Sequence, residues 1–311
     1  MDLGTGLGLG LAALGRPAYI NGGRAADLGS DRSVDALRRR TATVLDAAYA
    51  GGVRYFDAAR SYGRAEEFLA GWLASRPDVD DVAIGSKWGY TYVGEWRADA
   101  PVHEVKDHSV AAYRRQVAET RSLLGDRLSA YLIHSVTPES PALDDSSLLR
   151  ELAQLRSQSV RIGLSTSGPR QAETVRRALG LSVDGEPLFT VVQSTWNVLE
   201  TSAGPALAEA AAAGRTVVVK EALANGRLTA GEAGPAVTEA ARRAGAPVDE
   251  WALAVALAQP WAARVLTGAV TVEQIGRNLR ATTLGLPPDA AADLAEAPER
   301  YWTERASRAW A

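Results

Sequence analysis

Short apolar runs alternate with amphipathic segments along the whole sequence, and this alternation constrains the fold most. Continuous apolar runs are typical of strands buried on both faces, as in parallel sheets. Eight such runs predict strands, at residues 7–14, 53–57, 82–87, 130–135, 161–166, 190–195, 216–221 and 264–269. The segments between them predict helices, at 33–50, 64–75, 109–124, 146–157, 169–179 and 205–213, with a last one opening at 271. Eight strand–helix units indicate an α/β fold, a (β/α)8 TIM barrel.

Two local motifs support these boundaries. Gly51 and Gly52 follow the first predicted helix, where glycine is typical of a C-terminal cap. Thr271 and Gln274 form a capping box at the start of the last barrel helix. A barrel of this kind uses roughly 250 residues as one domain. Because no linker interrupts the sequence, we expect a single domain over residues 1–311.

Two segments are longer than a barrel requires. Residues 88–107 carry four aromatic side chains and directly follow a predicted strand, so we expect them to form a pocket wall. The C-terminal tail, from about residue 287 to 311, is also rich in aromatic residues. It either lines the pocket or packs against the outer helices.

The composition excludes several classes of protein. The absence of cysteine excludes a disulfide framework, thiolate catalysis and a cysteine-bound metal, and no metal site is expected. The net charge of −3 gives no basic field that would attract nucleic acid or an anionic membrane. No apolar run reaches the roughly 18 residues of a membrane span. The first residues lack the basic start of a signal peptide. We therefore expect a cytoplasmic protein that acts on a small molecule.

Polar side chains end three of the predicted strands. Asp57 ends the second strand, Lys87 the third and His134 the fourth, and Tyr62 follows Asp57 by one short turn. The carboxyl ends of parallel barrel strands meet at one mouth, so these four side chains should converge there. Only three of the 34 basic residues are lysines, so a lysine at a strand end suggests that an amine is needed.

These four groups suit proton transfer. A carbonyl reduced by hydride becomes an alkoxide that must receive a proton, and Tyr62 can donate it if a cation stabilises the phenolate. Lys87 can supply that charge, and Asp57 can hold Lys87. His134 can donate a hydrogen bond to the substrate oxygen or help relay the proton. Each residue alone has a simpler explanation, such as a helix cap or a buried core histidine. Their joint placement on successive strands favours the catalytic one.

The glycines at positions 4, 6, 8 and 10 do not form a dinucleotide-binding fingerprint. Leu9 stands where the spacing G-x-G-x-x-G needs a glycine, and no helix follows within the turn. A tightly packed first strand is the expectation.

Residues 55–63, Tyr-Phe-Asp-Ala-Ala-Arg-Ser-Tyr-Gly, resemble a segment of the aldo-keto reductase superfamily. In that family the Asp and Tyr of this segment form a catalytic tetrad with a Lys that ends strand three and a His that ends strand four. Residues 86–87 and 132–135 match those two sites. The resemblance therefore implies a catalytic tetrad of Asp57, Tyr62, Lys87 and His134.

The resemblance extends over nearly the whole chain and implies a nicotinamide nucleotide. Residues 163–168 and 192–197 are similar to the segments that hold the nicotinamide carboxamide, which implies roles for Ser165, Thr166 and Gln193. Residues 268–279 resemble the segment that binds the adenosine phosphate. The implied cofactor-binding residues there are Gly268, Ala269, Gln274, Arg277 and Asn278, of which Asn278 would contact adenine.

The chain departs from the family pattern at three places. Lys220 stands near the position where many relatives stack an aromatic ring on nicotinamide, so its stem covers the ring or its amine meets phosphate. Gln274 replaces an arginine of many NADPH-specific relatives, although Arg277 and Arg280 lie nearby and could meet a 2′-phosphate. The family's N-terminal hairpin is missing or very short.

The resulting expectation is an NADP(H)-dependent carbonyl reductase in which Tyr62 is the general acid and base. NAD(H) is the alternative cofactor. Some relatives act mainly as nucleotide-binding regulatory subunits, and a sensor subunit with slow or vestigial catalysis is the alternative function. The substrate is expected to be a small aldehyde, ketone or alcohol, and the sequence does not indicate its identity or the oligomeric state.

Overall fold

Eight parallel strands close into a barrel in the computed structural model, which describes residues 6–20 and 27–310. The strands follow the order β1-β12-β11-β10-β7-β6-β3-β2 around the barrel, and β1 pairs with both β12 and β2. The barrel strands are β1 (Gly6–Gly10), β2 (Tyr55–Asp57), β3 (Ala83–Trp88), β6 (Leu128–Val136), β7 (Arg161–Thr166), β10 (Val191–Thr195), β11 (Thr216–Lys220) and β12 (Arg264–Thr267). The (β/α)8 barrel predicted from the sequence is confirmed.

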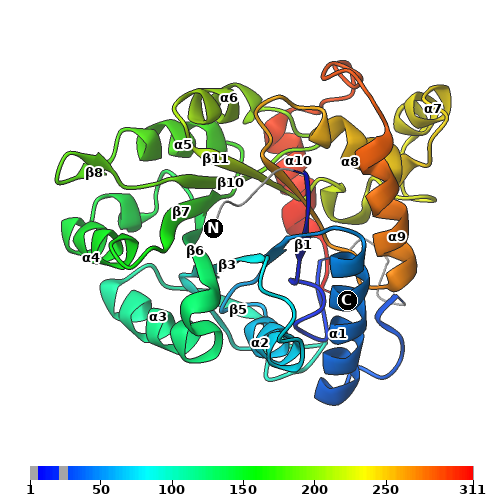
Figure 1. The fold of residues 1–311 in the computed structure, drawn as a ribbon. Coiled ribbons are helices and arrows are strands. Elements are labelled where there is room, and N and C mark those ends of the chain that lie inside the picture. The colour runs from blue at the N-terminus through cyan, green and yellow to red at the C-terminus, as the bar shows by residue number, and fades with distance from the viewer. Residues whose placement is uncertain (1–5, 21–26, 311) are drawn as a thin grey trace.

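Helices surround the barrel, and α1 lies beside α9, so the first and last barrel helices meet (Figure 1). The helices are α1 (Val34–Ala50), α2 (Ala65–Ser75), α3 (Val110–Leu124), α4 (Ser146–Arg156), α5 (Gln171–Leu179), α6 (Gly204–Ala212), α7 (Pro235–Arg243), α8 (Val248–Leu257), α9 (Val272–Arg280) and α10 (Pro298–Ser307). Side-chain caps start several of them. Ser33 Oγ accepts from Ala36 N, and Thr271 Oγ1 accepts from Gln274 N at 3.1 Å, which is one half of the predicted capping box. The Gln274 side chain accepts from Val270 N rather than from Thr271 N.

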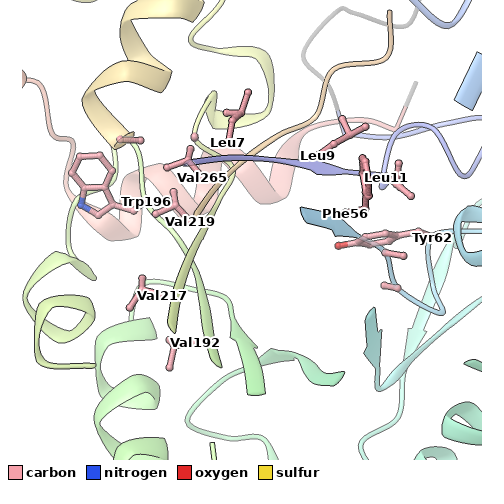
Figure 2. Packing of buried hydrophobic residues seen from close by; sticks show 14 of the residues in the cluster. Leu7, Leu9, Leu11, Phe56, Tyr62, Val192, Trp196, Val217, Val219 and Val265 are labelled. Atoms are coloured by element: carbon pink, nitrogen blue, oxygen red, sulfur yellow. The ribbon is translucent and has the colours of Figure 1, made fainter. Parts of the chain in front are cut away.

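The strands bury alternate side chains on two sides. One set faces the helices and belongs to the main core, and Figure 2 shows members of it on β1, β10, β11 and β12. The other set fills the barrel interior and consists of Tyr55, Ala83, Ala130, Leu132, Val191, Val218 and Leu266. This period of two decides which residues at the strand ends point into the barrel mouth.

Glycines make room for a tyrosine inside the barrel. A Cβ on Gly85 would lie 2.2 Å from the Tyr55 hydroxyl oxygen, and one on Gly8 would lie 3.0 Å from Tyr55 Cδ1 and 2.9 Å from Leu266 Cδ2. The contact from Gly85 is far too short for a real Cβ, and those from Gly8 are at or below the limit, so Tyr55 occupies space that the missing side chains leave. In the first strand Gly8 therefore serves close packing, whereas a Cβ on Gly6 would meet nothing within 4 Å.

The first strand is shorter than predicted. It ends at Gly10, and the chain then turns, with Leu14 N and Gly15 N both donating to Leu11 O. The apolar residues after Gly10 form this turn and most of them are buried. A run of buried apolar residues looks like a strand in the sequence. Gly15 O accepts from Arg64 N at 2.7 Å and so ties the turn to the loop after β2.

Segments outside the barrel repeat add two short hairpins. One pairs β4 (Tyr90–Tyr92) with β5 (Glu104–Lys106), and the other pairs β8 (Ser182–Val183) with β9 (Glu186–Pro187). The expected loss of the N-terminal hairpin concerns residues that lie mainly outside the described ones. No helix within residues 6–20 and 27–310 is long and apolar enough to cross a membrane.

Candidate active site

Five polar side chains continue the inward-facing series at the carboxyl ends of the strands. Asp57 lies two residues after Tyr55, Lys87 four after Ala83, and His134 two after Leu132. Gln193 and Lys220 follow Val191 and Val218 in the same way. Because alternate residues share a face, the same pattern that fills the barrel interior directs these five groups toward its mouth.

Lys87 lies at the centre of this group. Its ammonium is fully buried and donates to Asp57 Oδ2 at 2.5 Å, to Ala58 O at 2.9 Å and to the Tyr62 hydroxyl at 3.3 Å. An ammonium has three protons, so these three acceptors satisfy all of them. The Asp57 carboxylate supplies the counter-charge that a buried ammonium needs.

Tyr62 is held on the loop after β2 by close backbone packing. A Cβ on Gly15 would lie 2.2 Å from Tyr62 O, and Tyr62 N donates to Ala59 O. Burial and the Asp57 carboxylate raise the pKa of Tyr62 well above 10, while the Arg16 guanidinium lowers it. The sequence had suggested that a nearby cation would lower this pKa. Burial and the Asp57 carboxylate outweigh the Arg16 guanidinium, so the pKa of Tyr62 is raised rather than lowered.

His134 faces Tyr62 at a ring-centroid distance of 5.5 Å, and its Nδ1 lies 3.4 Å from Ser61 Oγ. Its carbonyl accepts from His108 Nε2 at 2.8 Å. Burial lowers the pKa of His134 well below 6.5, and the Lys87 ammonium acts in the same direction. His134 is therefore neutral at neutral pH.

These side chains open into a cavity of about 310 Å³ at the barrel mouth. Of the predicted site residues, the cavity is lined by Asp57, Tyr62, His134, Gln193, Lys220, Gly268, Ala269, Gln274, Arg277 and Asn278. Three of the predicted catalytic residues, Asp57, Tyr62 and His134, thus open into the same continuous space as the predicted adenosine segment. The volume is within the range of small-molecule sites.

Gln193 offers a vacant acceptor in this cavity. Its Nε2 donates to Asp57 Oδ1 at 2.9 Å, while its Oε1 is buried and has no hydrogen-bond partner in the described part of the chain. A buried carbonyl oxygen without a donor is unfavourable unless a ligand supplies one. The amide of a nicotinamide carboxamide is such a donor, so this residue fits the nucleotide that the sequence predicts.

Two other predicted cofactor residues are placed differently. Ser165 Oγ accepts from Ser135 N at 2.8 Å, beside His134. Thr166 points to the other side of β7, where its hydroxyl lies 2.7 Å from Ser194 Oγ and 3.1 Å from Gln171 Oε1 on α5. Neither Ser165 nor Thr166 is among the residues that line the cavity, and the two side chains point to opposite sides of the strand because they are adjacent in it.

Lys220 belongs to a buried charge cluster with Glu221 and Arg305 of α10. Arg305 donates to both Glu221 oxygens, at 2.8 and 2.5 Å, and Lys220 Nζ donates to Thr195 Oγ1 at 2.8 Å. Burial lowers the pKa of Lys220 to about 8. Burial would raise the pKa of Glu221, but Arg305 and Lys220 outweigh it and bring that pKa to about 2.

Sequence reasoning missed a second ion pair at the cavity. Arg16 is 1% exposed, and its Nη1 donates to Glu104 Oε1 at 2.6 Å and to Ser61 O at 3.0 Å. Its guanidinium lies 5.1 Å from the Tyr62 ring centroid and 4.5 Å from that of Trp310. Arg16, Glu104, Arg305 and Trp310 all line the cavity. Of the aromatic side chains in residues 88–107, Tyr90 lines it, whereas Trp88 packs against Tyr113.

A family comparison agrees with this geometry. The sequence model described as the Aldo/keto reductase family matches residues 7–299. The chain therefore belongs to the aldo-keto reductase family.

Individual relatives are more distant. Aldo-keto reductase str7 of Strobilurus tenacellus is 27% identical over 190 residues, and the match covers 60% of this chain and 51% of that protein. This chain thus matches about half the length of that relative. Aldo-keto reductase AKR11C1 of Bacillus halodurans, solved in a holo form, gives a TM-score of 0.68 at 21% identity and 96% coverage of each chain. A Pseudomonas aeruginosa structure assigned to the aldo-keto reductases gives 0.64 at 24% identity, covering 90% of this chain and 92% of that one. These two structures share the fold.

Proposed function

We propose that the protein is a carbonyl reductase that uses a nicotinamide nucleotide to convert an aldehyde or ketone into an alcohol, reversibly. One observation carries the proposal. The Lys87 ammonium contacts both the Asp57 carboxylate and the Tyr62 hydroxyl, at 2.5 and 3.3 Å, where Tyr62 meets the cavity. This arrangement places a proton donor beside a fixed positive charge, which is what an alkoxide product requires.

The bound nicotinamide would supply the hydride. Tyr62 donates its proton to the oxygen of the substrate, and its high pKa keeps that proton available throughout the neutral range. Lys87 stabilises the phenolate that remains. Asp57 pairs with Lys87 and holds it in place.

His134 positions the substrate oxygen. It is neutral, and its Nδ1 faces Ser61, so its other ring nitrogen can donate a hydrogen bond toward the cavity. A neutral donor binds the oxygen without competing with Tyr62 to lose a proton. His134 is therefore proposed to orient the carbonyl rather than to protonate it.

The nucleotide would lie along the cavity from Gln193 to the first turns of α9. Gln193 Oε1 and Ser165 are proposed to hold the carboxamide, and the stem of Lys220 to cover the ring. Asn278 lines the other end, where its Nδ2 donates to Thr267 Oγ1 at 2.5 Å. Gly268 and Ala269 bring bare backbone to the same place, where the helix N-terminus favours phosphate.

Resemblance alone implies NADP(H), with Arg277 as the cavity-lining cation that could meet a 2′-phosphate. NAD(H) is the alternative cofactor.

Steady-state turnover tests the proposed function. The purified protein is mixed with NADH or NADPH and a panel of aliphatic, aromatic and sugar aldehydes, and nucleotide oxidation is followed by absorbance. We expect sustained turnover with at least one aldehyde. Tight nucleotide binding without turnover on any member of a broad panel would instead support a nucleotide-binding sensor.

A further inference from the structure

Two lysines reach the barrel mouth, and their surroundings differ. The Lys87 side chain is 0% exposed, and its ammonium has three oxygen acceptors. The Lys220 side chain lines the cavity and is 14% exposed. Among the described residues its ammonium has two oxygen acceptors, Thr195 Oγ1 at 2.8 Å and Glu221 Oε1 at 3.4 Å, and the Trp302 ring centroid lies 6.0 Å away. An ammonium has three protons, so Lys220 is held less completely than Lys87.

The carboxylate nearest to Lys220 is already paired with another cation. Arg305 donates to both oxygens of Glu221, at 2.8 and 2.5 Å, whereas Lys220 reaches one of them at 3.4 Å. A two-point arginine–carboxylate pair is stronger than a single long contact. The cluster therefore contains two cations and one carboxylate. Arginine does not lose its proton in proteins, so Lys220 is the cation of this cluster that can become neutral.

The other charges that face Lys220 favour the neutral amine. Burial lowers the pKa of Lys220 to about 8, and the positive charges of Arg305 and Lys87 act in the same direction, while Glu221 opposes them. His134, which also lines the cavity, is neutral. At pH 7 roughly one molecule in ten therefore carries Lys220 as a free amine, which is the nucleophilic form.

We propose that Lys220 is a nucleophilic amine, kept available by the Arg305–Glu221 pair, that forms a reversible imine with an aldehyde that enters the cavity. The amine nitrogen attacks the carbonyl carbon and a C–N bond forms. The carbonyl oxygen leaves as water with the two protons of the amine, so the step needs no oxidant or reductant.

The product of this step suits its surroundings. The imine nitrogen takes up a proton from solvent, and the resulting positive charge stands where the ammonium stood, beside Glu221. The cavity of about 310 Å³ gives the aldehyde room next to the amine. The proposal requires this cavity and this amine, and it does not depend on the proposed reductase activity.

Reductive trapping on the full-length chain tests the proposal. The chain, without added nucleotide, is mixed at pH 7 with propanal and sodium cyanoborohydride, which reduces the imine to a stable secondary amine, and the labelled peptides are located by mass spectrometry. The sequence has only three lysines, so Lys106, which is exposed and outside the cavity, and the buried Lys87 are internal controls. We expect Lys220 to be labelled at least about threefold faster than Lys106.

Two variants separate the amine from its setting. Lys220→Arg keeps the positive charge beside Glu221 and should lose the cavity label, while Lys106 is labelled as before. Arg305→Gln frees Glu221 to pair with Lys220, which raises the pKa of Lys220, so the label at Lys220 at pH 7 should fall at least about threefold. Arg300→Gln, an exposed arginine of the same helix outside the cavity, is the matched control and should be labelled as wild type.

The contradicting results are equally definite. A label confined to Lys106 and the α-amino group, or a label at Lys220 that forms no faster than that at Lys106, would overturn the proposal. Labelling of Lys220 in Arg305→Gln at the wild-type rate, with the fold retained by circular dichroism, would overturn the role given to the Arg305–Glu221 pair.

Discussion

Gln193 and Asp57, which are 136 positions apart in the sequence, are joined by a 2.9 Å hydrogen bond across the barrel mouth. This bond fixes the orientation of the Gln193 amide, because only its nitrogen can donate to a carboxylate. The unpartnered Oε1 is thereby left for a ligand. The bond connects the residue proposed to hold the nicotinamide with the carboxylate that holds the proposed catalytic lysine.

Substituting Gln193 tests this connection. Gln193→Met keeps the length of the side chain but removes both hydrogen-bonding groups. We expect nucleotide Kd to rise about tenfold, the effect of losing one buried hydrogen bond. Gln154→Met on the surface of α4 is the control and should bind as wild type. Unchanged nucleotide affinity in Gln193→Met, measured by calorimetric titration, would remove Gln193 from the cofactor site.

The Lys87–Asp57 pair should show its buried character in stability. Lys87→Met leaves the Asp57 carboxylate 2% exposed and without its counter-charge, which we expect to cost about 3–5 kcal/mol of unfolding free energy. The double substitution Lys87→Met/Asp57→Leu should recover part of that loss, because it removes the stranded charge. Urea unfolding of the single and double variants measures this. A Lys87→Met protein as stable as wild type would mean that the pair is not buried as described.

Glu221 should make the protein sensitive to acid. Its pKa is about 2 in the folded chain against 4.5 for an ordinary glutamate. The stability that this difference contributes is present above pH 4.5 and is lost as the pH falls through the folded pKa, about 3 kcal/mol in all. The difference in unfolding free energy between the wild type and Glu221→Gln should therefore become smaller as the pH is lowered from 6 toward 3. Glu186→Gln, an exposed residue in the β8–β9 hairpin, should show no such trend in the same unfolding series.

The pH dependence of reduction follows from Tyr62 and His134. Tyr62 holds its proton to well above pH 10, and His134 stays uncharged to well below pH 6.5. We therefore expect kcat/KM for carbonyl reduction to be flat between these limits with respect to both groups. An inflection near pH 6.5 that disappears in His134→Gln would contradict the neutral state assigned to His134.

The barrel itself could be predicted because each buried strand is a short apolar run. The prediction was wrong where apolar residues are buried without forming a strand. Residues 11–14 are apolar, and Leu11, Ala13 and Leu14 are buried, but they form a turn that leads the chain to the loop that carries Tyr62. Helix α8 was missed for a related reason. Nearly all of its residues from Asp249 to Ala256 are buried, so it lacks the polar face that reveals most helices.

The site could be predicted only in part. Asp57, Lys87 and His134 were identifiable because a polar residue at the end of an apolar strand is conspicuous. Arg16 and Glu104 were not, because their contact joins the turn after β1 to the β4–β5 hairpin, 88 positions away. Nothing in either local sequence predicts that approach, which depends on how the two segments fold over the mouth.

Tyr62→Phe tests the central claim most directly. The substitution removes one hydroxyl and keeps the ring that packs beside Arg16 and His134. With an aldehyde that the wild-type chain reduces, kcat should fall by about 10²–10⁴-fold, the loss expected for a general acid, while the Kd for the nucleotide stays within about twofold. Turnover by Tyr62→Phe at the wild-type rate, with the nucleotide bound as tightly as before, would show that Tyr62 does not supply the proton.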